Sequence, residues 1–431
     1  MKGRLSSSTL SRRIRQRIAP VATAAALLAM AAGLVACGGE DDDSATLRWF
    51  VAIQPGGSIQ EVAKRCTEQS DGKYRITLEL LPTDADSQRE QLVRRLGAED
   101  RTVDIIGMDV IWTAEFANAG WIRPWRGEHA KKVTEGVFDS VIETASFEGE
   151  LYGAPFNSNT QLLWYRTDKV DSPPETWDDM ISTAEDLDMY VQVQAGRYEG
   201  YTVWVNSMIT SAGTQILSWP EEVDLAEEPT ETALATIGKL ARSPAAAPNI
   251  STSNEDSARL GFEAGNSAFM LNYTFAYASA QANAPDIAEN MGAAKLPKVV
   301  DDHPSSPPLG GFNLGIGAYS ANSDLAFEAA TCLASPENQL VLTELDGLPP
   351  SNRELYSDDI VQKAFPGFAD EIRDSIADAV PRPLTPAYTD VSLAIQRSLH
   401  PPQSINPDDP EPKYDELKQN VQDAVLRKGL L

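Results

Sequence analysis

The sequence predicts an α/β fold divided into two lobes. From residue 46 onward, strand patterns and helix patterns alternate along the chain. The chain of 431 residues is too long for a single hydrophobic core. Two extended stretches, residues 157–166 and 310–318, could each carry the chain from one lobe to the other. Together these features favour two lobes joined by crossing strands.

The first lobe is expected to begin with a βαβαβ unit. Residues 47–53 and 74–81 read as strands because apolar residues alternate, and residues 58–69 and 87–98 have helical spacing. Residues 103–108 form a continuous apolar run that is typical of a buried strand. This order predicts a sheet that begins with largely parallel strands.

Helices predominate in the second region. Residues 149–155 and 157–166 read as two extended segments with polar residues between them, and residues 267–272 and 292–296 as strands. The helices expected after residue 170 are 177–187, 199–212, 230–242, 256–264, 324–335, 336–345, 391–399 and 414–427. We see no internal repeat in the sequence.

The N-terminal segment has the pattern of an export signal. Four arginines between positions 12 and 17 precede an apolar run at residues 21–36. An uncleaved membrane anchor is the alternative, but the run is shorter than the ~20 residues that a spanning helix needs. Residues 1–36 are therefore expected to be a signal peptide.

The apolar run ends in Leu-Val-Ala-Cys, which resembles a bacterial lipobox with Cys37 as the lipidated residue. The residues that follow are small, polar and acidic, as in a flexible tether, so residues 37–45 are expected to link the lipid to the body. A buried structural cysteine is the alternative. Cys66 and Cys332 are the other cysteines; they could pair outside the cell or remain buried free thiols, and both alternatives stay open.

The charge excludes one class of partner. The formal net charge is −27, and the basic residues of the leader would be lost on cleavage. Without a basic patch to displace counterions from phosphate, nucleic acid is not an expected partner. Nor do the cysteines and histidines have the spacing of a metal site, so we expect no metal and no cofactor.

Asp109 is the first candidate site residue. It follows directly after the buried strand at residues 103–108. The carboxyl ends of parallel strands face the ligand crevice in open α/β sheets, so its position alone indicates a binding role. Asp109 could also cap the following short helix, and the two roles are compatible.

From about Thr46 to the C-terminus, the chain resembles the extracellular sugar-binding proteins of ABC importers. The segments that carry the resemblance are MDVIW (108–112) with Gly120-Trp121, LYGAP (151–155), NTQLLWYR (159–166), GGFNLGI (310–316) and PRPLTPAY (381–388). Three of the runs, residues 109–116, residues 159–165 and the segment led by Arg382, look closest to the actinobacterial trehalose-binding lipoproteins of the LpqY type. The resemblance implies a two-lobe periplasmic-binding-protein-like fold with hinge crossings and a central ligand cleft. Lobe I would comprise residues 46–157 plus about 309–355, and lobe II residues 158–308 plus about 356–431.

The resemblance also implies which polar residues bind the sugar. Asp109, Asn159 and Arg382 match positions that the family uses to bind hydroxyl groups, where a carboxylate or a guanidinium fork gives directional selectivity. Arg89 falls where members have a rim arginine, although a solvated helix charge is the alternative. Glu255 could reach the sugar from lobe II, or stabilise the start of its helix.

Aromatic rings are expected to stack on the faces of the sugar. Tyr273, Phe312 and Tyr388 are the candidates, and members of the family often carry tryptophan at the first two positions. The alternative for each ring is core packing. Gly310 and Gly311 would let the backbone approach the ligand closely, or form a turn.

The resulting hypothesis is a lipid-anchored sugar-binding protein on the extracellular face of the membrane that performs no catalysis. It would bind trehalose or a related disaccharide, close its lobes around it, and deliver it as a monomer to ABC permease subunits. A binding protein for maltodextrin or a glycerophosphodiester is one alternative. A secreted carbohydrate-active hydrolase is another, although His129, His303 and His400 lie beside charged or Pro-rich loops rather than in a hydrolase motif. An adhesin or scaffold would lack a small-molecule pocket.

Overall fold

The computed structural model describes residues 44–82, 85–218 and 221–426, which belong to one compact unit, Ser44–Leu431. The expected signal peptide, Cys37 and nearly all of the tether lie outside the described residues. Within the described part of the chain, no helix combines the length and apolar character needed to cross a membrane.

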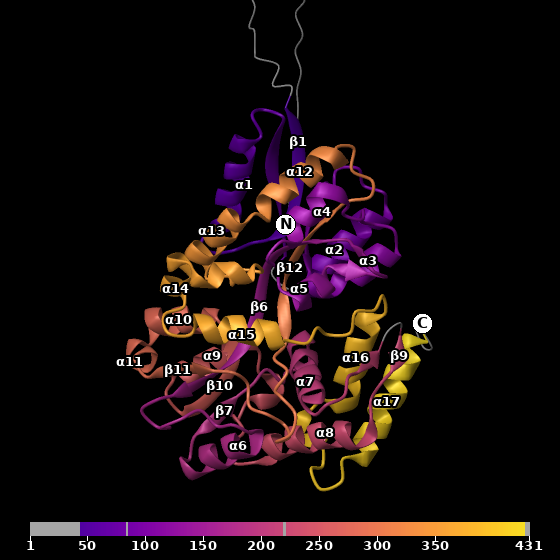
Figure 1. Ribbon diagram of the computed structural model, residues 1–431. Coiled ribbons are helices and arrows are strands. Elements are labelled where there is room, and N and C mark those ends of the chain that lie inside the picture. The colour runs from indigo at the N-terminus through magenta and orange to yellow at the C-terminus, as the bar shows by residue number, and fades with distance from the viewer. Residues whose placement is uncertain (1–43, 83–84, 219–220, 427–431) are drawn as a thin grey trace, which may run out of the picture. The chain divides into compact units, whose positions relative to one another are not determined.

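A central sheet organises the fold (Figure 1). In the described part of the chain it has eight strands, and seven of them lie side by side in one path. In spatial order these are β2 (Tyr74–Leu81), β1 (Ala45–Ala52), β3 (Ile105–Asp109), β12 (Leu309–Ile316), β6 (Ala154–Arg166), β10 (Ser267–Tyr273) and β7 (Tyr190–Gln192). The eighth strand, β11 (Met291–Ala294), pairs with β6 off this path.

Strand direction changes along the sheet. β1 is parallel to both β2 and β3, as the βαβαβ pattern predicts. β12 is antiparallel to both of its neighbours, β3 and β6. On the other side of the sheet, β6 is antiparallel to β10 and to β11, whereas β10 is parallel to β7. The sheet is therefore mixed, and its parallel start is the part that local sequence patterns predicted.

β6 is shared by the two halves of the sheet. Residues from Ala154 to Thr160 pair with β12, whereas residues from Gln161 to Arg166 pair with β10 or β11. We expected two extended segments, 149–155 and 157–166, but the structure has a short hairpin strand, β5 (Glu150–Leu151), followed by one long strand. The polar residues near position 158 do not interrupt β6, because the strand is buried there and its backbone is paired.

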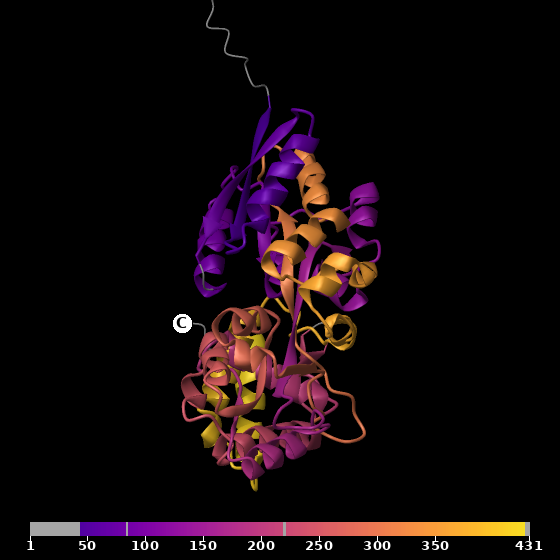
Figure 2. The ribbon, with the colours of Figure 1, turned by 90° about the vertical axis from the view of Figure 1, so that its left-hand side faces the viewer.

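Two groups of helices pack around the two halves of the sheet (Figures 1 and 2). Around β1–β3 lie α1 (Ser58–Gln69), α2 (Ala85–Gly97), α3 (Thr113–Asn118), α4 (Gly127–Thr134), α5 (Asp139–Thr144), α12 (Ser323–Leu333) and α13 (Pro336–Asp346). Around β7 and β10 lie α6 (Trp177–Asp186), α7 (Glu199–Ser211), α8 (Glu227–Arg242), α9 (Glu255–Glu263), α10 (Phe275–Asn283), α11 (Pro285–Ala288), α16 (Tyr388–Leu399) and α17 (Glu411–Val425). The residue ranges of the two lobes stay a prediction.

A third apolar cluster lies where the two groups meet. The cluster combines Phe138 from the first group with Trp164 on β6 and Phe262 from the second. Two helices that we did not expect, α14 (Asp359–Ala364) and α15 (Ala369–Asp378), cover it. Local patterns missed them because they are short and follow a Pro-rich break. Their apolar residues are buried by partners from both halves of the fold.

Cys66 and Cys332 form a disulfide bond that joins α1 to α12. Cys66 is fully buried in the apolar cluster beneath β1. The sequence left pairing and free thiols as equal alternatives, and the structure has the pair bonded. The bond connects two parts of the chain separated by 266 positions.

Candidate functional site

The buried guanidinium of Arg382 links two carboxylates from distant elements. Arg382 lies in the loop between α15 and α16, and its side chain is only 6% exposed. Its Nη1 donates to Glu199 Oε1 at 2.7 Å, and its Nη2 donates to Asp109 Oδ1 at 3.5 Å. Glu199 begins α7 in one helix group, and Asp109 ends β3 in the other. The fork therefore bridges the two halves of the fold.

Asp109 performs the capping role that the sequence allowed, and its predicted role in ligand binding stays a prediction. Its Oδ1 accepts a hydrogen bond from the backbone N–H of Ile111 at 3.2 Å, which caps the short helix η1 (Val110–Trp112). The same oxygen accepts the weaker bond from Arg382. The end of β3 therefore places the carboxylate at the junction, and the cap holds its orientation.

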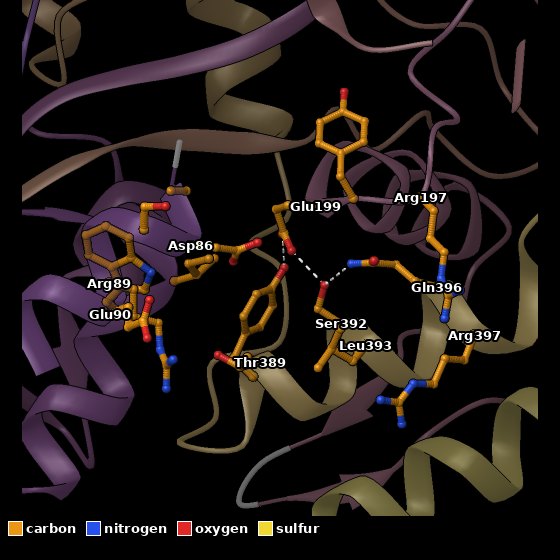
Figure 3. Close-up of a pocket in the computed structure, with 16 residues that line it drawn as sticks. Asp86, Arg89, Glu90, Arg197, Glu199, Thr389, Ser392, Leu393, Gln396 and Arg397 are labelled. Carbon is orange, nitrogen blue, oxygen red and sulfur yellow. Dashed lines mark hydrogen bonds between the residues drawn. The ribbon is translucent and has the colours of Figure 1, made fainter. Parts of the chain in front are cut away.

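Glu199 is the centre of a polar network that sequence reasoning missed. Its Oε1 also accepts from the hydroxyl of Tyr388, and its Oε2 accepts from Ser392 Oγ at 2.6 Å. Ser392 in turn accepts from Gln396 Nε2 at 3.1 Å (Figure 3). The spacing of four between Tyr388, Ser392 and Gln396 puts all three on one face of α16. That spacing was the available signal, but an acid in a first helical turn is ordinarily explained by the helix dipole.

Electrostatics keep Arg382 charged. Burial alone would lower the pKa of Arg382, but the surrounding Tyr388, Asp109 and Glu199 raise it well above its ordinary value. Burial, followed by the negative charge of Glu199, raises the pKa of Tyr388 well above its usual range. Arg382 therefore stays a cation and Tyr388 stays a neutral phenol, whose hydroxyl donates a hydrogen bond to the carboxylate of Glu199.

A cavity of about 650 Å³ opens beside this network. α2 and η1 contribute one wall, and the start of α7 with one face of α16 contributes the other (Figure 3). Arg197 and Arg397 lie on the second wall, opposite Asp86 and Glu90 on the first. This volume is in the range of small-molecule sites.

Glu255, Tyr198 and Tyr273 form a second polar group near Arg382. Glu255, the first residue of α9, accepts from the hydroxyl of Tyr198 at 2.8 Å, and burial raises the pKa of this carboxyl group. Tyr273 ends β10; burial raises its pKa, and the negative charge of Glu255 raises it further. Arg382 and Asp109 also act on Tyr273 electrostatically. The structure thus places these residues in one neighbourhood.

Comparison with known proteins identifies the family. A sequence profile described as bacterial extracellular solute-binding protein matches residues 53–340. The chain belongs to this family. A Deinococcus radiodurans protein named as a probable ABC transporter-binding protein is 28% identical over 356 residues, 75% of this chain and 81% of that protein.

Solved structures share the fold of this solute-binding protein. The maltose-bound MalE3 of T. maritima is 23% identical, with a TM-score of 0.75 over 88% of this chain and 99% of that chain. The sugar-binding protein MalE of Xanthomonas citri is 19% identical, with a TM-score of 0.76 over 89% and 98% of the two chains. These similarities confirm the predicted two-lobe α/β fold. The family consists of binding proteins, which confirms the prediction that the chain is not an enzyme.

The glycine and aromatic candidates on β12 lie beside β6 and β3. Gly311 has a φ of 127°, and a Cβ atom there would lie 2.3 Å from the carbonyl oxygen of Asn157. Phe312 pairs in register with Asp109 and packs partly buried against the core. Close strand approach therefore accounts for Gly311.

Asn159, Arg89 and Tyr388 make contacts within the protein. The side-chain oxygen of Asn159 accepts from the backbone N–H of Thr160 at 3.0 Å. Arg89 forms a bidentate ion pair with Glu115, with Nε to Oε2 at 2.7 Å, and also lines the 650 Å³ cavity. Tyr388 is 3% exposed and its ring packs in an apolar cluster, while its hydroxyl reaches Glu199. Sugar contact by each predicted residue stays a prediction.

No group of three or more histidine, cysteine, aspartate or glutamate side chains has the geometry of a metal site in residues 44–82, 85–218 and 221–426. The single positive charge of Arg382 is shared between the carboxylates of Asp109 and Glu199. The arrangement can therefore bind a polar ligand through hydrogen bonds from fixed donors and acceptors.

Proposed function

We propose that this solute-binding protein is the sugar receptor of an ABC importer, held on the outer face of the membrane by a lipid on Cys37. Its ligand is a trehalose-like disaccharide. The observation that carries the proposal is the Arg382 fork between Asp109 and Glu199, beside a cavity of about 650 Å³ that both helix groups line. The relative named as a probable ABC transporter-binding protein supports the importer role.

The chemistry around Arg382 suits a neutral carbohydrate. A sugar hydroxyl both donates and accepts, so it can form a hydrogen bond with the guanidinium as well as with either carboxylate. An anionic ligand would compete with Asp109 and Glu199 for the same guanidinium. Tyr273 at the end of β10 and the partly buried Phe312 on β12 are the rings that we propose to stack on the C–H groups of a pyranose.

The proposed ligand-binding residues come from both helix groups, which supports a mechanism in which the lobes close around the ligand. A ligand shifts the lobes toward a closed state only by making additional contacts in that state. Asp109 comes from the first group, and Glu199 and Glu255 come from the second. A sugar in contact with both sides would therefore favour closure, and the closed form would be delivered to the permease as a monomer.

Maltodextrin is the second candidate ligand. Two of the similar structures are named as complexes with maltose and maltotetraose. The cavity beside Glu199 extends along α16 as far as Arg397, which favours a ligand longer than one ring. The two candidates differ in glycosidic linkage, so direct titration separates them.

Isothermal titration of the purified body, residues 44–431, tests the proposal. We expect a one-to-one complex with trehalose that is tighter than those with maltose, glucose or a glycerophosphodiester. Asp109→Asn, which keeps the shape of the side chain, should weaken binding by about tenfold or more because it removes a charged hydrogen-bond acceptor. Flat traces with every sugar would overturn the proposal. Appearance of glucose after prolonged incubation with trehalose would instead favour a hydrolase.

The lipid anchor needs a separate experiment. In full-length protein expressed in an actinobacterial host, wild-type protein should partition with membranes. Cys37→Ser should appear in the aqueous fraction, because the thiol that carries the lipid is missing. Membrane retention of Cys37→Ser would contradict the anchor and leave the sugar proposal untouched.

A further inference from the structure

Charged side chains of opposite sign lie on opposite walls of the cavity of about 650 Å³. Figure 3 shows Asp86 and Glu90 on one side of this space and Arg197 and Arg397 on the other. All four residues are exposed. The two acids are four positions apart and therefore lie on one face of α2. Arg197 directly precedes the N-cap residue of α7, and Arg397 lies in the last turn of α16, so the acids and the arginines belong to different helix groups.

The other charged residues on these two walls already have partners. Arg89, on the wall that carries the acids, forms a bidentate ion pair with Glu115. Glu199, on the wall that carries the arginines, accepts from Arg382 at 2.7 Å. The charge that each wall still presents to the cavity is therefore negative on the side of α2 and positive on the side of α7 and α16.

The two arginines have no charged partner in the part of the chain that the structure describes. Within residues 44–82, 85–218 and 221–426, neither Arg197 nor Arg397 forms an ion pair or a side-chain hydrogen bond, and Asp86 forms no ion pair. Glu90 pairs with Arg94 one turn further along α2, but both side chains are more than half exposed. Such an exposed pair is weak, so Glu90 can exchange Arg94 for another cation at little cost.

Ion pairs between the walls can form only when the two helix groups approach each other. A contact that exists only in the closed state stabilises that state, whether it is made by a ligand or by the protein itself. Exposed ion pairs are individually weak, but a small difference in free energy is enough to shift an equilibrium between two states of similar stability. The same acids make the cavity mouth unfavourable for an anionic ligand, because they would repel it.

We propose that Asp86 and Glu90 pair with Arg197 and Arg397 when the helix groups approach, and that these ion pairs raise the population of the closed form before any ligand binds. A ligand that binds the closed form then gains affinity in proportion to that population. The gain is the same for every such ligand. A residue that contacts the ligand would instead change the affinities for different ligands by different factors.

Small-angle X-ray scattering of the ligand-free body tests the proposal without reference to any sugar. Asp86→Lys/Glu90→Lys makes both walls positive, and Arg197→Glu/Arg397→Glu makes both walls negative. Each double variant should have a larger radius of gyration than the wild type, because the walls repel. Combining all four substitutions restores opposite charges and should restore the wild-type radius.

A neutral variant and a change of salt concentration provide a second measurement, which also serves if a reversed variant does not fold. Raising KCl to about 1 M shortens the screening length from ~10 Å to ~3 Å, so it should increase the radius of gyration of the wild type. Arg197→Gln/Arg397→Gln should have a larger radius at low salt and should no longer respond to salt.

Arg101→Glu/Lys363→Glu is the matched control. Both residues are exposed, lie outside the cavity lining and form no ion pair in the described part of the chain. This variant changes the net charge as much as Arg197→Glu/Arg397→Glu does, and it should keep the wild-type radius. Equal radii for the control and the arginine variant would overturn the inference. So would a fourfold variant that stays as expanded as either double variant.

Sugar titration gives the functional readout. Arg197→Gln/Arg397→Gln should weaken the binding of trehalose and of maltose by the same factor, about threefold or more. Unequal factors would mean that the arginines contact the ligand, and would overturn the inference while supporting the sugar receptor. Flat titrations of the wild type would overturn the sugar receptor instead, and the scattering measurements would still decide whether the ion pairs form.

Discussion

At the scale of single residues, Arg382 is the side chain on which both the stability of the fold and the proposed binding of sugar depend most. It is nearly fully buried, it pairs with carboxylates from both halves of the fold, and its ring neighbour Tyr388 lies with its centroid 5.8 Å from the guanidinium carbon. The family resemblance implied that Asp109, Asn159 and Arg382 are site residues. It did not indicate Glu199, whose role depends on α7 being packed against α16.

Replacing Arg382 should therefore destabilise the protein as well as weaken sugar binding. Arg382→Met leaves Glu199 and Asp109 facing each other without a cation, so we expect a loss of about 3 kcal/mol in the free energy of unfolding. Urea denaturation measures the loss. Arg373→Met is the matched control: Arg373 pairs with Asp370 and Asp374 but is 40% exposed, so its loss should stay below about 1 kcal/mol. Equal losses in the two variants would contradict the buried role of Arg382.

Glu255 should make stability depend on pH. Burial raises the pKa of its carboxyl group above the ordinary value of 4.5. The folded protein then binds this proton more tightly than the unfolded chain does. The stabilisation that comes from this tighter protonation of Glu255 is fully present below pH 4.5, and it is lost as the pH rises through the pKa of the folded protein.

Glu255→Gln removes this dependence. The variant should be more stable than the wild type above the folded pKa, and the advantage should vanish below pH 4.5. The amide oxygen can still accept from Tyr198, so the neighbouring hydrogen bond is retained. Urea midpoints measured across this range check the difference between the two proteins. A constant difference at every pH would show that Glu255 does not titrate as proposed.

At the scale of elements, local patterns predicted most helices and strands but not their partners. α1 and β2 have the bounds that apolar spacing indicated, Ser58–Gln69 and Tyr74–Leu81. α10, α14 and α15 were missed, because their apolar residues are buried by contacts from distant parts of the chain rather than by a clear local stripe. The sequence analysis predicted two segments in place of β6, because its buried polar residues have the composition of a loop and a single sequence does not reveal the neighbouring strands that pair with them.

The contact of β12 with β6 can be tested at two adjacent glycines. At Gly311 the backbone has a positive φ and no room for a Cβ atom beside Asn157, so Gly311→Ala should cost about 2 kcal/mol or more. At Gly310 the nearest atoms to a Cβ would lie 3.7 Å away, in ordinary contact. Gly310→Ala should therefore stay within about 0.5 kcal/mol of the wild type. Thermal or urea unfolding compares them, and equal effects would mean that β12 does not approach β6 as described.

At the scale of the whole molecule, the Cys66–Cys332 bond ties the first helix of the body to a helix far along the chain. Closing so long a segment restricts the unfolded chain, so reduction should lower the free energy of unfolding by about 2–4 kcal/mol. Urea midpoints with and without dithiothreitol measure this. The Cys66→Ala/Cys332→Ala variant is the control and should not respond to the reductant. Identical midpoints for oxidised and reduced wild type would contradict a structural role for the bond.

By itself, the sequence determined the α/β class, the parallel start of the sheet and the positions of most elements, and its family resemblance predicted Asp109 and Arg382, which the structure brings into contact. Periodicity and ordered motifs carry that information, because both are properties of neighbouring residues. Only the tertiary structure decided that Glu199 pairs with Arg382, that β6 is shared by both halves of the sheet, and that Cys66 pairs with Cys332. Each of these depends on which segments far apart in the chain come into contact, and that is settled by burial across the whole fold.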